Sequence, residues 1–195
     1  MAYPTVSAPY GFQPINRVDG MPYAGATRQI NISGSYNTAI YKGDLVVVVT
    51  GGTLEKYTGT TTGSPVGVFM GVQYVNAQSQ TVQAQYYPGT SVTSAVAYVV
   101  DDPMAAFKVA VTDSSSVMSS AARAAIGSNM SVIQGTGSAT TGDSGQSVLA
   151  GSEATTDTLP IRVIDVVPAT ATGTDTFVEL VVKINLHQYN NTTGV

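Results

Sequence analysis

Residues 66–75 read Val-Gly-Val-Phe-Met-Gly-Val-Gln-Tyr-Val, and this run sets the β character of the chain. β-branched and aromatic residues dominate it, and residues of these kinds favour strands. Its two glycines, Gly67 and Gly71, indicate bulges or the close approach of another backbone. We therefore predict a β-strand over residues 66–75.

Strand patterns separated by turns continue on both sides of this run. After it, residues 81–87 alternate between apolar and polar side chains until Pro88-Gly89 ends the pattern. Before it, the apolar run 45–49 follows the turn Lys42-Gly43-Asp44. Further strands are predicted at residues 28–32, 38–41, 95–100, 107–111, 159–167 and 176–186. Many short strands without a βαβ rhythm predict a mainly β fold, either an antiparallel β-sandwich or a barrel-like domain.

One short helix is predicted, at Val117–Ile126. This segment is rich in alanine, the serines at 114–116 can cap its start, and Gly127 can end it. The later run 135–145 is rich in Gly, Ser and Thr, which is typical of a mobile loop.

The first 26 residues differ in character from the rest of the chain. Prolines at 4, 9, 14 and 22 favour an extended backbone, and the aromatic and aliphatic side chains between them distinguish the stretch from a Gly/Ser linker. The predicted organisation is an extended N-terminal arm (1–26), a single β-rich domain (27–189) and a polar tail (190–195). The arm either lies on a neighbouring molecule or folds back on its own domain. In the first case, deleting residues 1–26 should leave the domain folded.

The composition excludes several classes of protein. Eight basic and twelve acidic residues give a net charge of -4, which argues against a nucleic-acid partner. A hydrophobic content of 43% argues against wholesale disorder. Because there is no cysteine, disulfides, thiolate metal sites and cysteine nucleophiles are excluded.

No membrane partner is expected either. The longest apolar run, 45–49, is far shorter than the roughly 20 residues that span a bilayer. The start of the chain has no basic region and no apolar core, so we expect no signal peptide and synthesis in the cytosol.

Catalytic motifs are weak. The segment Gly142-Asp-Ser-Gly145 looks like a serine nucleophile, and the order Ser144, Asp165, His187 would suit a hydrolase. Position 146 is Gln, however, so the Gly-x-Ser-x-Gly pattern fails. We therefore expect no enzyme, and a structural role for the lone histidine, His187.

No metal or cofactor is expected. The best acidic pair is Asp101-Asp102, and adjacent residues of a strand point to opposite faces. A turn or capping role is the simpler interpretation of this pair. No glycine-rich phosphate-binding motif is complete.

The residues that are abundant suggest adhesion. The chain has 11 tyrosines, and only 10% of its residues are charged, against about 25% in a typical domain. Tyrosine, hydroxyl and amide side chains are typical of binding surfaces. Because surface charge usually keeps a monomer soluble, so low a charge suits a protein whose surface is covered in an assembly.

Motifs along the chain resemble a family of tailed-bacteriophage structural proteins, most sharply at the two ends. Those of the first part are Ala8-Pro-Tyr-Gly-Phe-Gln-Pro14, Arg17, Asp19-Gly20 and Tyr23-Ala-Gly-Ala-Thr27. Those of the later part are Asp101-Asp-Pro103, Phe107, Ile161-Arg-Val163, Lys183-Ile-Asn-Leu-His187 and Asn191-Thr-Thr-Gly-Val195.

This resemblance implies a capsid decoration (cement) protein that binds the outer surface of the major capsid lattice and stabilises the mature head. It implies two partners, the major capsid protein and further copies of the chain, most simply as trimers at threefold or quasi-threefold positions. It implies a location on the capsid exterior after synthesis in the host cytoplasm. It implies no active site and no cofactor. The candidate interaction residues are Tyr3, Tyr10, Phe12, Arg17, Tyr23 and His187.

Two alternatives stay open beside this one. A tail, fibre or vertex component could use the Tyr/Thr/Asn-rich surface on a host glycan. A hydrolase would use Ser144 and His187, and we rank it last.

Overall fold

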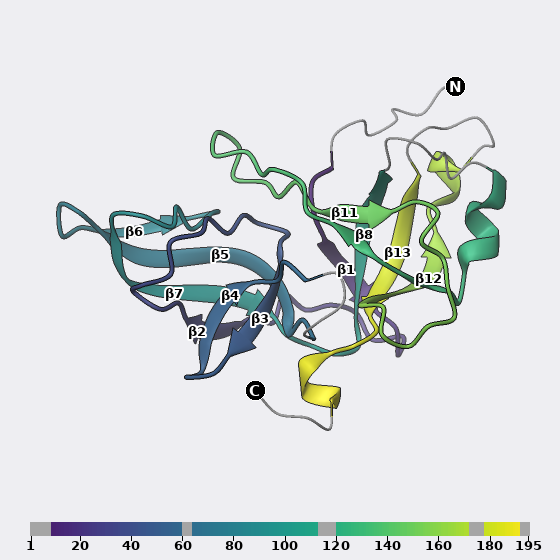
Figure 1. Cartoon of the computed structure of the whole chain (residues 1–195), viewed down its shortest axis with the longest axis horizontal. Coiled ribbons are helices and arrows are strands. Elements are labelled where there is room, and N and C mark those ends of the chain that lie inside the picture. The colour runs from purple at the N-terminus through teal and green to yellow at the C-terminus, as the bar shows by residue number, and fades with distance from the viewer. Residues whose placement is uncertain (1–8, 60–63, 113–119, 172–177, 192–195) are drawn as a thin grey trace.

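The structure is a computed structural model that describes residues 9–59, 64–112, 120–171 and 178–191. Strands make up 45% of it and helices 6%, which confirms the mainly β prediction. Two sheets lie next to each other along the long axis of the molecule (Figure 1). None of the helices in the described part is long and apolar enough to cross a membrane.

The six-stranded sheet takes its strands from the first half of the chain. They are β2 (Arg28–Asn31), β3 (Leu45–Val49), β4 (Thr53–Lys56), β5 (Gly67–Asn76), β6 (Thr81–Ala84) and β7 (Val92–Val100). Their order is β2-β7-β5-β3-β4, with β6 also paired to β5, and all pairs are antiparallel. A parallel bridge between Ile32 and Leu54 brings the end of β2 to β4, so the sheet curls back on itself.

The seven-stranded sheet combines the N-terminal strand with the second half of the chain. Its strands are β1 (Gln13–Arg17), β8 (Ala105–Thr112), β9 (Asn129–Met130), β10 (Val132–Ile133), β11 (Ser147–Leu149), β12 (Ile161–Val166) and β13 (Glu179–Ile184). The order is β10-β11-β8-β13-β12-β9, with β1 also paired to β8. Only Ser131 separates β9 from β10, so the two ends of this order are adjacent in the chain. The pair β11–β8 is parallel, unlike the other pairs of this sheet.

The helices in the described residues are 3-10 helices, namely η1 (Ser120–Ala125), η2 (Pro168–Thr170) and η3 (Gln188–Asn190). The helix predicted at Val117–Ile126 therefore becomes η1 over its described part, and residues 117–119 lie outside the described residues. A helix this short gains too few i→i+4 bonds to be stable alone, and the tighter 3-10 form is common in such pieces.

The apolar core has two parts, and one of them takes residues from both sheets. One part consists of side chains of the six-stranded sheet and its loops, and includes Ile40, Phe69 and Tyr87. The other lies under β8, β12 and β13, but it also takes in Leu45 and Val68 from the other sheet. Burying each large apolar side chain contributes about 1.5–3 kcal/mol, so this shared core joins the sheets firmly.

The described part of the N-terminal segment lies on its own chain. Strand β1 pairs with β8, Phe12 is only 1% exposed, and the Phe12 N–H donates to Gly43 O at 2.9 Å. Pro14 is accommodated because β1 is a bulged strand that pairs only with β8 among the described strands. Residues 9–17 thus adopt the second of the two placements considered for the arm. Deleting residues 1–26 would remove β1 and part of the core, so we no longer expect the remainder to keep its fold.

Candidate functional site

Three of the predicted interaction residues gather around the turn between β7 and β8. The Arg17 guanidinium lies 2.7 Å from Asp102 and 2.7 Å from Asp19. Tyr23 packs against the core, and burial followed by the charge of Asp102 raises the pKa of its hydroxyl. His187 is buried, and Asp101 and Asp102 are the charged groups that act on it. The turn Asp101–Met104 is therefore where the predicted residues converge.

The aspartates of this turn have the structural role that the sequence suggested. Asp102 Oδ1 accepts a hydrogen bond from Met104 N at 2.8 Å, and Asp102 O accepts one from Ala105 N at 3.0 Å. These bonds close the turn that carries the chain from one sheet to the other. Asp102 also pairs with Arg17, and Asp101 pairs with Arg28.

Two further residues, neither of them predicted from the sequence, belong to the same surface. Arg28 Nε lies 2.9 Å from Asp101 Oδ2, and its guanidinium carbon lies 5.3 Å from the centre of the Tyr189 ring. Arg28 Nη1 also donates to the Tyr189 hydroxyl at 3.2 Å. No local pattern predicts this contact, because β2 and η3 lie more than 150 residues apart and meet only in the folded chain.

We call this region the turn surface and define it by Arg17, Val18, Asp19, Met21, Tyr23, Arg28, Asp101, Asp102 and Tyr189. Met21 is 60% exposed and Tyr189 46%, and Val18 is also exposed. Each arginine is paired to at least one aspartate, so little free charge remains here. Exposed Tyr, Met and Arg side chains are the types enriched in protein interfaces.

The other predicted interaction residues lie elsewhere. The Tyr10 hydroxyl donates to Glu179 Oε1 at 2.5 Å, and Lys108 Nζ lies 5.4 Å from the centre of the Tyr10 ring. Burial, followed by the bond to Glu179, raises the pKa of Tyr10 well above its usual range. Phe12 is part of the core. Tyr3 lies outside the described residues.

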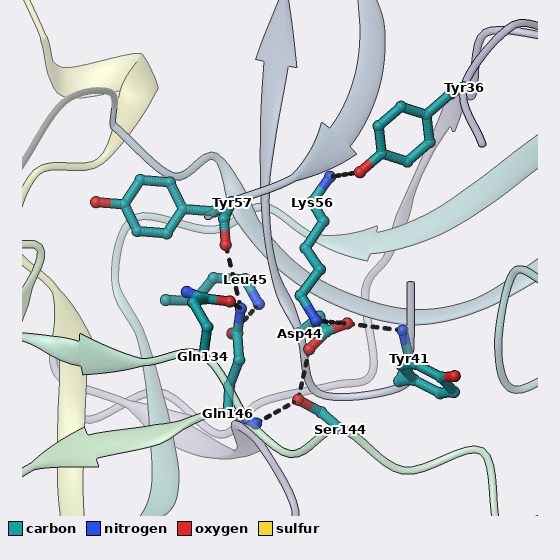
Figure 2. Close-up of polar contacts among 9 residues, drawn as sticks. All are labelled: Tyr36, Tyr41, Asp44, Leu45, Lys56, Tyr57, Gln134, Ser144 and Gln146. Atoms are coloured by element: carbon teal, nitrogen blue, oxygen red, sulfur yellow. Dashed lines mark hydrogen bonds and ion pairs between the residues drawn. The ribbon is translucent and has the colours of Figure 1, made fainter. Parts of the chain in front are cut away.

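A buried polar network, absent from the sequence analysis, joins the two sheets at Asp44 (Figure 2). Asp44 has no exposed surface, and its Oδ2 accepts from Tyr41 N at 2.8 Å. Its Oδ1 accepts from Ser144 Oγ at 2.5 Å, and Lys56 Nζ lies 3.1 Å from Oδ2. The carboxylate therefore has a hydrogen-bond donor on each oxygen and a cation beside it, as a buried charge requires.

Gln146 extends this network across the junction, by which we mean the boundary between the two sheets around Asp44 (Figure 2). Its Oε1 accepts from Leu45 N at 2.7 Å, while its Nε2 donates to Tyr57 O at 3.2 Å and to Gln134 Oε1 at 2.8 Å. Its N–H donates to Ser144 Oγ at 2.9 Å. The Gln146 side chain, just before β11, thus hydrogen-bonds Leu45 N in β3 and Tyr57 O just after β4, both in the other sheet.

The loop predicted at residues 135–145 ends in this junction. Ser144 is buried, and a Cβ on Gly135 would lie 1.8 Å from the carbonyl oxygen of Gly145. Glycine is needed at both Gly135 and Gly145 because the backbone around one contacts the backbone around the other. The end of the run is therefore a packed element, and its glycines serve close packing.

The structure separates the three residues of the hydrolase hypothesis. Ser144 Oγ donates to Asp44, and Asp165 Oδ1 accepts from the backbone N–H of Val166. His187 Nδ1 accepts from Tyr189 N. Since each residue is bonded to a different group, Ser144 has neither the base nor the orienting carboxylate that a triad needs.

The described residues also contain no group of three or more His, Cys, Asp or Glu side chains that could hold a metal ion. No protein-family model, no curated protein and no solved structure matched the chain.

Proposed function

We propose that this chain is a bacteriophage capsid decoration protein that binds the outside of the major capsid lattice and stabilises the mature head. The terminal motifs that resemble tailed-phage structural proteins support this proposal. The low charge of the chain supports it as well, since a surface covered by neighbours needs little charge for solubility.

The turn surface is the observation that carries the proposal furthest. It presents Met21 and Tyr189 to solvent while its arginines are neutralised by aspartates of the same chain. A surface of this kind favours a weakly charged protein partner, because its two arginines and three aspartates leave a net charge of only -1. We assign the contact with the shell to this surface.

The rigid connection between the sheets supports the same role. The shared core and the network at Asp44 hold both sheets in one unit, so a shell contact on one sheet can be transmitted to the other. Many copies that each bind weakly can hold a lattice together through effective concentration. We propose further copies of this chain, most simply in trimers, as the second partner.

The first experiment counts copies of the chain per shell subunit in purified particles. The proposal expects a ratio near one, and particles without the chain should lose resistance to heat. A ratio below about a tenth would contradict it, because closed symmetry then places the chain at a vertex or tail.

A second experiment tests the turn surface itself. Met21→Ser and Tyr189→Ala should lower occupancy on heads that lack the chain, whereas Ile126→Ser serves as the matched control. Ile126 is also exposed but follows η1, which packs on β12. Binding should change little between about 0.1 and 0.5 M salt, because few ion pairs are available for screening. Equal occupancy for all three variants would remove the turn surface from the proposal.

A tail, fibre or vertex component that binds a host glycan is the second candidate. One observation favours it, a groove of about 330 Å³ lined by uncharged groups that include Asn31, Gly34 and Ser94. Ser94 has a φ of 50°, and strained residues of this kind gather at functional sites. The copy number described above separates this candidate from the first.

A further inference from the structure

The C-terminal strap, residues 185–191, runs from the end of β13 onto the six-stranded sheet (Figure 1). Gln188 fastens it to β3, since its Oε1 accepts from Val48 N at 3.0 Å and its Nε2 donates to Val48 O at 2.7 Å. The backbone N–H of Gln188 donates to Pro65 O at 3.0 Å. The strap thus pairs with Val48 as a neighbouring strand would.

His187 begins η3 and positions Gln188. His187 is 1% exposed, and its Nδ1 accepts from the backbone N–H of Tyr189 at 3.2 Å, which caps the helix. A backbone N–H can only donate, so Nδ1 carries no proton and the ring proton of neutral His187 is on Nε2. Nε2 is buried and has no hydrogen-bond partner among the described residues.

Several charged groups face this ring. Burial lowers the pKa of His187 from its usual 6.5, and it outweighs the charges of Asp101 and Asp102 and the backbone groups of Val66 and Asp101, which favour the charged ring. Both carboxylates are already paired, Asp101 with Arg28 and Asp102 with Arg17.

The neighbouring Tyr189 remains neutral in the same pH range. Burial, followed by a hydrogen bond and the charge of Asp101, raises the pKa of its hydroxyl. The centre of its ring lies 5.2 Å from the centre of the His187 ring, and the two rings are tilted relative to each other. His187 is therefore the group of this cluster that gains a charge as the pH falls below the usual pKa of a histidine.

We propose that the strap is an acid-sensitive latch, in which protonation of His187 removes the cap of η3 and releases Gln188 from Val48. With a proton on Nδ1, two donors face each other and the Tyr189 N–H loses its acceptor. The added charge is buried beside carboxylates that are already paired. The latch is a property of this chain alone.

Because the pKa of His187 is lowered in the closed form, acid weakens the latch. A histidine with a lower pKa in the closed form binds fewer protons there than in the open form. The latch is therefore fully held above about pH 6.5, the value of an exposed histidine, and weakens as the pH falls below it.

Nuclear magnetic resonance on the full chain tests the latch, because the single histidine gives one assignable imidazole signal. Between about pH 7.5 and 5, where most carboxylates stay ionised, the Val48 amide should lose its exchange protection as the imidazole titrates. His187→Asn is the matched control, since Asn accepts the same N–H at an N-cap and does not titrate. In that variant the protection of Val48 should stay constant over the range.

Gln188→Ala provides the open reference and should leave Val48 weakly protected at every pH. The proposal is overturned if the wild type and His187→Asn lose protection in parallel. It is also overturned if His187 titrates in the wild type while the Val48 amide keeps its protection. The second comparison needs no variant, so it decides the matter even if His187→Asn does not fold.

Discussion

Ser144 Oγ donates a 2.5 Å hydrogen bond to Oδ1 of Asp44, one hundred positions earlier in the chain. Asp44 immediately precedes β3 of the six-stranded sheet, and Ser144 precedes β11 of the seven-stranded sheet. The bond is buried, and the same carboxylate also contacts Lys56. A serine that resembles a nucleophile in the sequence is therefore part of the connection between the two sheets.

Ser144→Ala should destabilise the fold by about 1.5–3 kcal/mol, because a hydrogen bond to a buried charge is lost. Urea unfolding followed by circular dichroism measures the change. Thr140→Ala, at an exposed position of the same loop, should stay within about 0.5 kcal/mol of the wild type. Equal stability of Ser144→Ala and the wild type would show that the bond does not hold the junction.

Lys56→Met should cost about 3–5 kcal/mol, because it leaves the fully buried carboxylate of Asp44 without its cation. Thermal unfolding checks this expectation. Arg123→Met removes a positive charge at an exposed site and is the matched control. If both variants lose the same amount of stability, the loss comes from removing any positive charge, and the ion pair at Asp44 is not its cause.

Phe12→Ala should destabilise the chain by about 3–5 kcal/mol, because the side chain fills part of the core beside Gly43. Ile15→Ala, only three residues away but 45% exposed, should change stability by no more than about 0.5 kcal/mol. Chemical denaturation of both variants tests whether the N-terminal segment is a structural element. A free arm would make the two substitutions equivalent.

Alkaline pH should unfold the protein through its tyrosines. Burial raises the pKa of Tyr10, and that of Tyr57 and Tyr87, so the folded chain holds these protons longer than the unfolded chain. Stability from this source is complete below about pH 10 and is lost as the pH rises above it. Phenolate absorbance near 295 nm should show a group of tyrosines that ionise only on unfolding. Tyr10→Phe should make the alkaline loss of stability less steep.

Local patterns identified many of the strands. The apolar run 45–49 coincides with β3, and the runs 66–75, 95–100 and 107–111 fall on β5, β7 and β8. The expected strand at 38–41 is reduced to one bridge, between Ile40 and Tyr87. Strands β1, β4, β9, β10 and β11 were missed. They have two to five residues each, too few for alternation to stand out, and they are held by pairing with longer strands.

The candidate site was only partly predictable. Arg17, Tyr23 and His187 were expected as contact residues, and the structure brings them together at Asp101–Asp102. Arg28 and Tyr189 complete the turn surface, but their contact depends on how η3 lies against β2. A pairing between such distant positions has no signature in a local window of sequence.

The amino-acid sequence alone determined the β character of the chain and its low charge, because period-two alternation and composition are properties of neighbouring residues. The tertiary structure decided where the charges went. It buried Asp44 with Lys56, paired Arg17 and Arg28 with aspartates, and buried the His187 side chain of the strap. Those contacts form only when two curled sheets meet, and the energy of a charge depends on its surroundings in space, whatever its position along the chain.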